Sequence, residues 1–116
     1  MRKIGIGTAQ FGMNYGVANK FGRVNKDETF RILEFAHSEG INTLDTAGIY
    51  GDSEETIGHH LRQRPDEDWH IITKINGKES NAEVQISESI GKLGATPETV
   101  LAHSAADYLD PLFRSA

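Results

Sequence analysis

The sequence predicts an α/β fold built from parallel βα units. Short runs rich in β-branched residues alternate with longer amphipathic stretches, in the order strand, helix, strand, helix, strand, helix, strand. Strands that alternate with helices in this way form parallel sheets with helical crossovers. The chain has 116 residues and no linker, repeat or low-complexity tract, so we expect one domain covering residues 1–116.

The first expected strand covers about Lys3 to Thr8, and a loop rich in glycine and asparagine follows it. That loop is long for a plain connection, which is typical of a functional segment. The first helix is expected to begin after Asn25, which can form a capping box with Glu28, and to stop at Gly40. Its expected buried stripe consists of Phe30, Leu33 and Ala36.

The rest of the chain repeats this pattern. A second helix is expected to start at Ser53, whose hydroxyl can cap it, and to run to about Arg62. A third helix is expected from about Asn81 to Leu93, with Gly94 as its stop. The remaining expected strands are Ile41–Asp45, His70–Ile75 and Thr99–His103. Residues 104–116 are interpreted as a loop and the start of another helix.

Composition and charge exclude several classes of function. The formal net charge is −5 and no basic stripe is present, which argues against nucleic acid as a partner. There is no cysteine, and the adjacent His59 and His60 cannot comfortably share a metal ion, so no metal site is expected. No stretch approaches the roughly 18 apolar residues of a membrane span. We therefore expect a cytoplasmic protein with no membrane partner.

Three polar residues stand at the carboxyl ends of successive expected strands. Asp45, Lys74 and His103 follow one another at intervals of 29 and 29 residues, about one βα unit. Because each residue occupies the same position in its strand, and the strands are parallel, the three side chains should lie on one rim of the sheet. This rim is where α/β proteins bind ligands. Side chains alternate between the two faces of a strand, so Asp45, Lys74 and His103 should share one face. The residues two positions earlier, Thr43, Ile72 and Leu101, should lie on that same face. The other face, covered by helices, should carry Leu44, Thr73 and Ala102.

Each of these polar residues also has an ordinary structural explanation. A lone aspartate is often a turn carboxylate, a lone lysine is usually solvated, and a strand-end histidine is usually hydrogen-bonded locally. Their joint placement on one rim and one face favours a functional site. Tyr50 lies five residues beyond Asp45 on the same rim. A phenol has a reference pKa near 10, and a close ammonium, here Lys74, makes it a better proton donor.

The segments that carry these residues resemble the aldo-keto reductases. They are residues 44–54 (LDTAGIYGDSE), 72–75 (ITKI), 101–104 (LAHS) and the opening 5–12 (GIGTAQFG). The pattern Asp-Thr-Ala-x-x-Tyr-Gly-x-Ser-Glu is specific, and the resemblance covers essentially the whole chain. It implies a TIM (β/α)8 barrel that reduces an aldehyde or ketone, a small-molecule carbonyl substrate, with NADPH or NADH.

The resemblance also implies roles for individual residues. Tyr50 matches the general acid, Lys74 the group that activates it, Asp45 the residue that orients the lysine, and His103 the residue that positions the carbonyl. Gly7, Thr8 and Gln10 match the rim of the first strand, where family members contact cofactor or substrate. These implied roles are expectations to be compared with the structure.

A full barrel of this kind has about 250 residues, and this sequence covers only its first half, with four strands and about three helices. We therefore expect a truncated chain, an incomplete cofactor site and little turnover by the 116 residues alone. Unpaired strand edges favour an alternative, a non-catalytic half-barrel that self-associates or pairs with a partner. A second alternative is a lyase or isomerase in which Lys74 forms a Schiff base, detectable by borohydride trapping.

Overall fold

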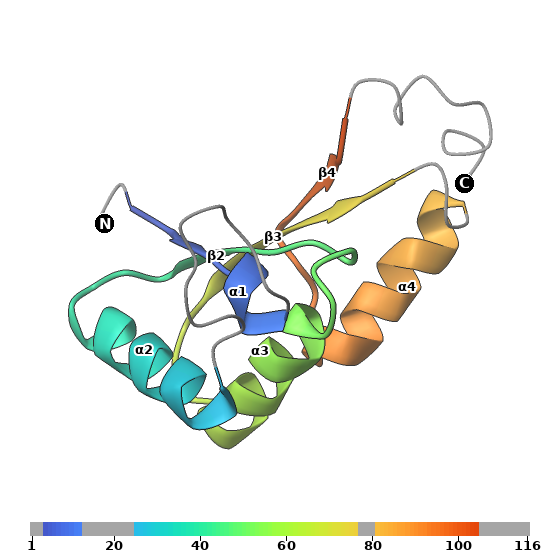
Figure 1. Ribbon diagram of the computed structural model, residues 1–116. Coiled ribbons are helices and arrows are strands. Elements are labelled where there is room, and N and C mark those ends of the chain that lie inside the picture. Colours follow the sequence, from blue (N-terminus) through green and yellow to red (C-terminus); the bar gives the residue numbers. More distant parts are fainter. Residues whose placement is uncertain (1–3, 13–24, 77–80, 105–116) are drawn as a thin grey trace.

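The computed structural model describes residues 4–12, 25–76 and 81–104 (Figure 1). Its centre is a four-stranded sheet in which every neighbouring pair is parallel and the spatial order follows the chain order. The strands are β1 (Ile6–Gly7), β2 (Thr43–Asp45), β3 (His70–Ile75) and β4 (Thr99–Ala102). This arrangement confirms the expected α/β class and the parallel βα units.

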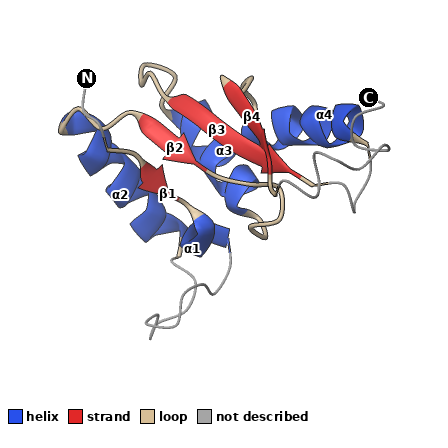
Figure 2. Ribbon diagram, turned by 90° about the horizontal axis from the view of Figure 1, so that it is seen from above, coloured by secondary structure: helices blue, strands red, loops and turns tan. Residues whose placement is uncertain are grey.

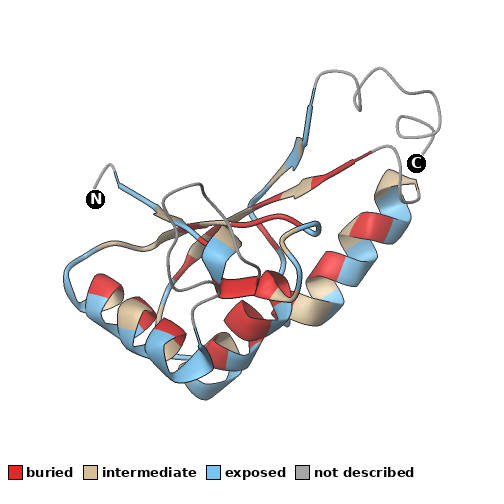
Figure 3. Ribbon diagram, in the orientation of Figure 1, coloured by how far each residue is buried: buried red, intermediate tan, exposed pale blue. Residues whose placement is uncertain are grey.

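The long helices lie along one face of the sheet (Figures 1 and 2). They are α2 (Lys26–Ser38), α3 (Ser53–Gln63) and α4 (Ala82–Leu93). A short helix that was not expected, α1 (Ala9–Gly12), directly follows β1 where the sequence predicted a loop. The apolar core lies between sheet and helices, and the helix sides turned toward the sheet are buried (Figure 3). Its members are Phe11, Leu33, Ala36, Leu44, Ile57, Trp69, Ile71 and Leu93.

The expected ends of two helices are confirmed. Asn25 and Asn81 are N-caps, and each side-chain oxygen accepts a hydrogen bond from the backbone amide three residues later, at 2.8 and 2.9 Å. Each bond satisfies one of the amides that a helix start leaves unpaired. Gly40 and Gly94 adopt the left-handed backbone conformation at the other ends, with φ of 83° and 65°.

Two details of the helices differ from expectation. Ser53 is not the N-cap of α3, because Asp52 occupies that position without a side-chain cap bond. The Ser53 hydroxyl instead forms buried contacts with the residues that directly follow β1 and β2, Thr8 and Thr46. Phe30 is half-buried rather than part of the core, and Thr29 is fully buried in its place. The Phe30 ring lies on the side of α2 that meets α3, where it stacks on His59 with 5.4 Å between centroids.

The alternation of side chains along the strands agrees with the expectation. Leu44 and Thr73 are fully buried toward the helices, whereas Ile72 is half-buried and Leu101 is 45% exposed. No described helix covers the face that carries Ile72 and Leu101. In a closed barrel this face is the interior. A half-barrel leaves it open to solvent, which agrees with the exposure of Leu101.

Some expectations concern residues outside the described part of the chain. They include the beginning of the first strand at Lys3, most of the glycine- and asparagine-rich loop (Asn14, Gly16, Asn19 and Gly22) and residues 105–116 of the final segment. Within the described residues, no helix is long and apolar enough to cross a bilayer.

A buried polar network lies at the end of the sheet where the strands begin, next to the start of β3. The side chain of Glu67 is almost fully buried, and its Oε1 lies 2.8 Å from Nε2 of His60 and accepts from Nε1 of Trp69 at 2.9 Å. Burial by itself raises the pKa of Glu67, but hydrogen bonds from Trp69 and His60 and the charges of His60 and Arg64 outweigh that effect. The net result is a Glu67 pKa below its ordinary value.

Because the pKa of Glu67 is lower in the folded chain than in the unfolded one, its carboxylate stabilises the fold above the unfolded pKa, near 4.5. This contribution is lost as the pH falls through the folded pKa. We expect Glu67→Gln to lower the unfolding free energy at neutral pH by about 1–3 kcal/mol and to flatten its decline toward acid pH. Urea unfolding at several pH values, followed by fluorescence of the single tryptophan, tests this. Parallel pH curves for the two proteins would contradict it.

Candidate functional site

The carboxyl ends of the strands bring the predicted polar residues to one rim. The sheet register pairs Gly7 with Asp45, Asp45 with Ile72, and Lys74 with Leu101. Lys74 therefore stands two residues above the position opposite Asp45, and both side chains emerge on the face that the helices leave uncovered. His103 follows β4 directly, and its amide donates to the Ile75 carbonyl at 2.8 Å, which continues the sheet ladder by one residue.

Lys74 is held by two oxygen atoms, one at the end of β2 and one on the residue that follows it. Its Nζ contacts the Asp45 carboxylate and donates to the Thr46 carbonyl at 3.0 Å. The Lys74 side chain is 16% exposed and that of Asp45 is 50% exposed, so water screens this ion pair only in part.

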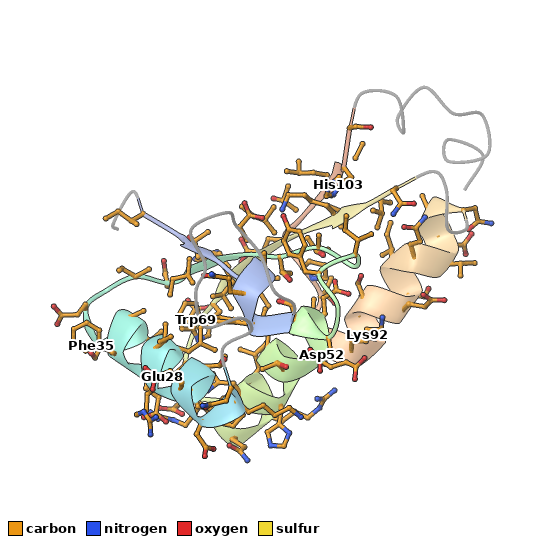
Figure 4. All side chains as sticks on the ribbon, viewed as in Figure 1. Glu28, Phe35, Asp52, Trp69, Lys92 and His103 are labelled. Atoms are coloured by element: carbon orange, nitrogen blue, oxygen red, sulfur yellow. The ribbon has the colours of Figure 1, made fainter. Side chains whose placement is uncertain are left out.

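Tyr50 and His103 complete the group. Nζ of Lys74 lies 5.2 Å from the centroid of the Tyr50 ring, within the range of a cation–π contact. The His103 ring meets the Tyr50 ring edge to face, with 6.5 Å between centroids and an angle of 81°. Figure 4 shows His103 at the end of the sheet opposite Trp69. The structure thus brings Asp45, Tyr50, Lys74 and His103 together at one rim.

A cavity of about 270 Å³ opens beside this group. Its lining residues are Gly7, Thr8, Ala9, Gln10, Asp45 and Tyr50. A Cβ atom added at Gly7 would meet no heavy atom within 4 Å, so this part of β1 offers open space for a flat group next to Tyr50. The cavity includes all three positions that the sequence predicted to contact a cofactor.

The three predicted contact positions differ in what they present. Gly7 and Gln10 are exposed at the cavity. Thr8 is fully buried, and its hydroxyl donates to the Asp45 carbonyl at 3.0 Å and accepts from the Ser53 hydroxyl at 2.9 Å. Its amide and carbonyl are also bonded inside the protein. Thr8 therefore forms part of the cavity wall, and its polar atoms are hydrogen-bonded to other groups inside the protein.

One feature of the site was missed from the sequence, namely the contact of α1 with the loop that carries Tyr50. A Cβ atom added at Gly12 would overlap the Tyr50 carbonyl and lie 2.9 Å from Cα of Ser53. A Cβ atom added at Gly51, which has a φ of 58°, would likewise overlap the Gly12 carbonyl oxygen. Only glycine allows two backbones to approach so closely. The Phe11-Gly12 pair after the first strand was the available signal, since Phe11 is buried in the core.

The rim has the components of a proton donor for an oxygen atom. A phenol can release a proton, an adjacent ammonium stabilises the negative charge left on it, and an imidazole can donate a hydrogen bond to the same acceptor. Asp45 neutralises and orients the ammonium. This arrangement suits polarisation of a carbonyl group, and it contains no electron donor of its own.

Comparisons with known proteins agree with this geometry. Two solved structures of Pseudomonas aeruginosa proteins assigned to the aldo-keto reductases superpose on the chain, each with a TM-score of 0.73. One is 32% identical and the other 28%, and the match covers 87% and 96% of this chain but only 42% and 47% of theirs. The chain therefore spans less than half the length of these neighbours, which makes it a partial barrel.

Two curated fungal relatives match a shorter part. Norsolorinic acid reductase B of Dothistroma septosporum is 37% identical over 64 residues, and aldo-keto reductase str7 of Strobilurus tenacellus is 40% identical over 60 residues. These matches cover 52% and 50% of this chain and 16% of each relative. The family model for aldo/keto reductases matches residues 3–111. With this match over nearly the whole chain, the protein belongs to the aldo/keto reductase family.

Proposed function

We propose that this chain supplies the proton-transferring half of a reductase that converts aldehydes or ketones to alcohols with NADPH or NADH. One observation carries the proposal: the Lys74 ammonium is bound to Asp45 on one side and lies against the Tyr50 ring on the other. A phenol flanked by a fixed positive charge is a suitable general acid for a carbonyl oxygen.

In the proposed reaction each residue of the rim has a separate role. The Tyr50 hydroxyl donates its proton to the substrate oxygen as negative charge develops there. Lys74, oriented by Asp45 and by the Thr46 carbonyl, stabilises the phenolate that remains. His103 lies against Tyr50 and is available to hydrogen-bond the same oxygen, which fixes the carbonyl for attack.

The cavity beside Tyr50 suits the cofactor that such a reaction needs. Gly7 leaves room for a flat nicotinamide ring, and Gln10 offers an amide at the same cavity. We assign the contact with the ring to these two residues, with the backbone at Thr8 as the cavity wall. When bound, a reduced nicotinamide supplies the hydride that the protein's own groups cannot.

The test uses a chimeric barrel, because the chain covers less than half of its structural neighbours. Residues 3–111 replace the matched segment of the 32% identical Pseudomonas aeruginosa neighbour. Oxidation of NADPH and of NADH is then followed with a panel of small aldehydes and ketones. Carbonyl-dependent oxidation supports the proposal. A folded chimera that binds reduced cofactor but turns over no carbonyl compound contradicts it.

A second candidate function is self-association. Ile4, two residues before β1, is 60% exposed, Leu101 on β4 is 45% exposed, and Phe35 on the outer side of α2 is 69% exposed. Exposed apolar groups beside open strand edges favour pairing with another chain. We expect light scattering of the purified chain to give the mass of a dimer or larger species. A well-folded monomer over the whole concentration range would exclude this candidate.

A further inference from the structure

Three fully buried hydroxyl groups meet directly behind the rim. They belong to Thr8 directly after β1, Thr46 directly after β2 and Ser53 at the start of α3. The Ser53 hydroxyl oxygen lies 2.9 Å from both the hydroxyl and the carbonyl oxygen of Thr8, which share its one proton, and 3.1 Å from the Thr46 hydroxyl oxygen. Ser53 is therefore the centre of a buried hydroxyl cluster.

Each member of the hydroxyl cluster also contacts one residue of the rim. The Thr8 hydroxyl donates to the Asp45 carbonyl at 3.0 Å. The Thr46 carbonyl accepts from the Lys74 ammonium at 3.0 Å. The Ser53 amide donates to the Tyr50 carbonyl at 3.0 Å. Three separate segments of the chain are thus joined through one buried network.

We propose that Thr8, Thr46 and Ser53 are positioning residues that set the relative placement of Asp45, Lys74 and Tyr50. The inference rests on the proposed reductase function. A satisfied buried network is directional and rigid, whereas apolar side chains of the same size would fill the space without fixing an angle. Precision matters here because small displacements of reacting groups reduce rates by about 100-fold.

The chain offers a matched control for this inference. Thr56 lies on α3, one turn beyond Ser53, and is also buried. No hydrogen-bond partner of its hydroxyl is present among the described residues. Thr56→Val and Thr46→Val make the same change in a buried threonine, but only the second removes a member of the hydroxyl cluster. A general effect of losing a buried hydroxyl would appear in both variants.

Steady-state kinetics of the chimera give the first readout. We expect Ser53→Ala and Thr46→Val to lower kcat about 10- to 100-fold with little change in KM, because orientation is lost while the cavity remains. Thr46→Ser should restore most of the rate, and Thr56→Val should leave it unchanged. Equal rates for Thr46→Val and Thr56→Val, or no recovery in Thr46→Ser, would overturn the proposal.

A second readout needs no turnover, so it separates this proposal from the proposed function. In the 116-residue chain, nuclear Overhauser contacts between the Tyr50 and His103 rings report their edge-to-face placement. We expect Ser53→Ala and Thr46→Val to weaken these contacts, and Thr46→Ser and Thr56→Val to preserve them. Unchanged contacts in all four variants would overturn the positioning role. An inactive chimera whose contacts respond as expected would reject only the reductase assignment.

Discussion

Replacing Tyr50 by phenylalanine is expected to lower kcat of the chimeric barrel by about 100- to 10,000-fold, the usual contribution of a general acid. The Tyr50→Phe variant keeps the ring against which Lys74 and His103 lie, and it removes only the hydroxyl that would donate the proton. The fold should be retained, because Tyr50 is only partly buried and its loop is held through backbone contacts.

The measurement compares the steady-state rates of the unaltered chimera and its Tyr50→Phe variant at several concentrations of the carbonyl substrate. Binding of reduced cofactor, followed by fluorescence, serves as the control and should be nearly the same in both. A rate within a factor of two or so of the unaltered chimera would remove Tyr50 as the proton donor. Loss of cofactor binding together with rate would indicate a collapsed site instead, and circular dichroism distinguishes that outcome.

Replacing Gly12 by alanine is expected to cause a large loss of stability for the addition of a single methyl group. The added Cβ would overlap the Tyr50 carbonyl and crowd Ser53, and both are backbone contacts that cannot rotate away. Overpacking of this kind costs about 1–3 kcal/mol or more. The gain of about 0.5–1 kcal/mol that alanine usually brings in a helix cannot offset it.

Gly91→Ala is the matched control for Gly12→Ala. Gly91 lies inside α4, and a Cβ atom added there would meet no heavy atom within 4 Å. This variant should therefore be more stable by about 0.5–1 kcal/mol, from helix propensity alone. Urea unfolding of both variants, followed by tryptophan fluorescence, gives the comparison. A Gly12→Ala chain as stable as Gly91→Ala would contradict the close contact between α1 and the loop that carries Tyr50.

Much of the fold could be predicted because its signals are local. Asn25, Asn81, Gly40 and Gly94 mark helix ends through short-range hydrogen bonds and backbone conformation, and the structure agrees at all four. Strand alternation likewise placed Leu44 and Thr73 on the helix-covered face. The spacing of one βα unit was enough to place Asp45, Lys74 and His103 on the same rim.

The remaining features depend on contacts between distant segments. Ser53 fits the pattern of a helix cap, but its hydroxyl bonds to Thr8, 45 residues away, and such a partner has no local signature. Helix α1 is only four residues long and depends on the fit of Gly12 against Gly51. Helix propensity and periodicity are weak guides at that length. The buried hydroxyl cluster was missed for the same reason.

A double-mutant cycle on the chimera tests most directly whether the Tyr50 phenol and the Lys74 ammonium act as one proton-donating unit. The cycle compares kcat/KM of Tyr50→Phe, Lys74→Met and the combined variant with that of the unaltered protein. Lys74→Met should fold, because the Asp45 carboxylate it leaves unpaired is half exposed. If the two groups act together, the combined variant will be no slower than Tyr50→Phe alone. Losses that multiply would show that the two groups act independently.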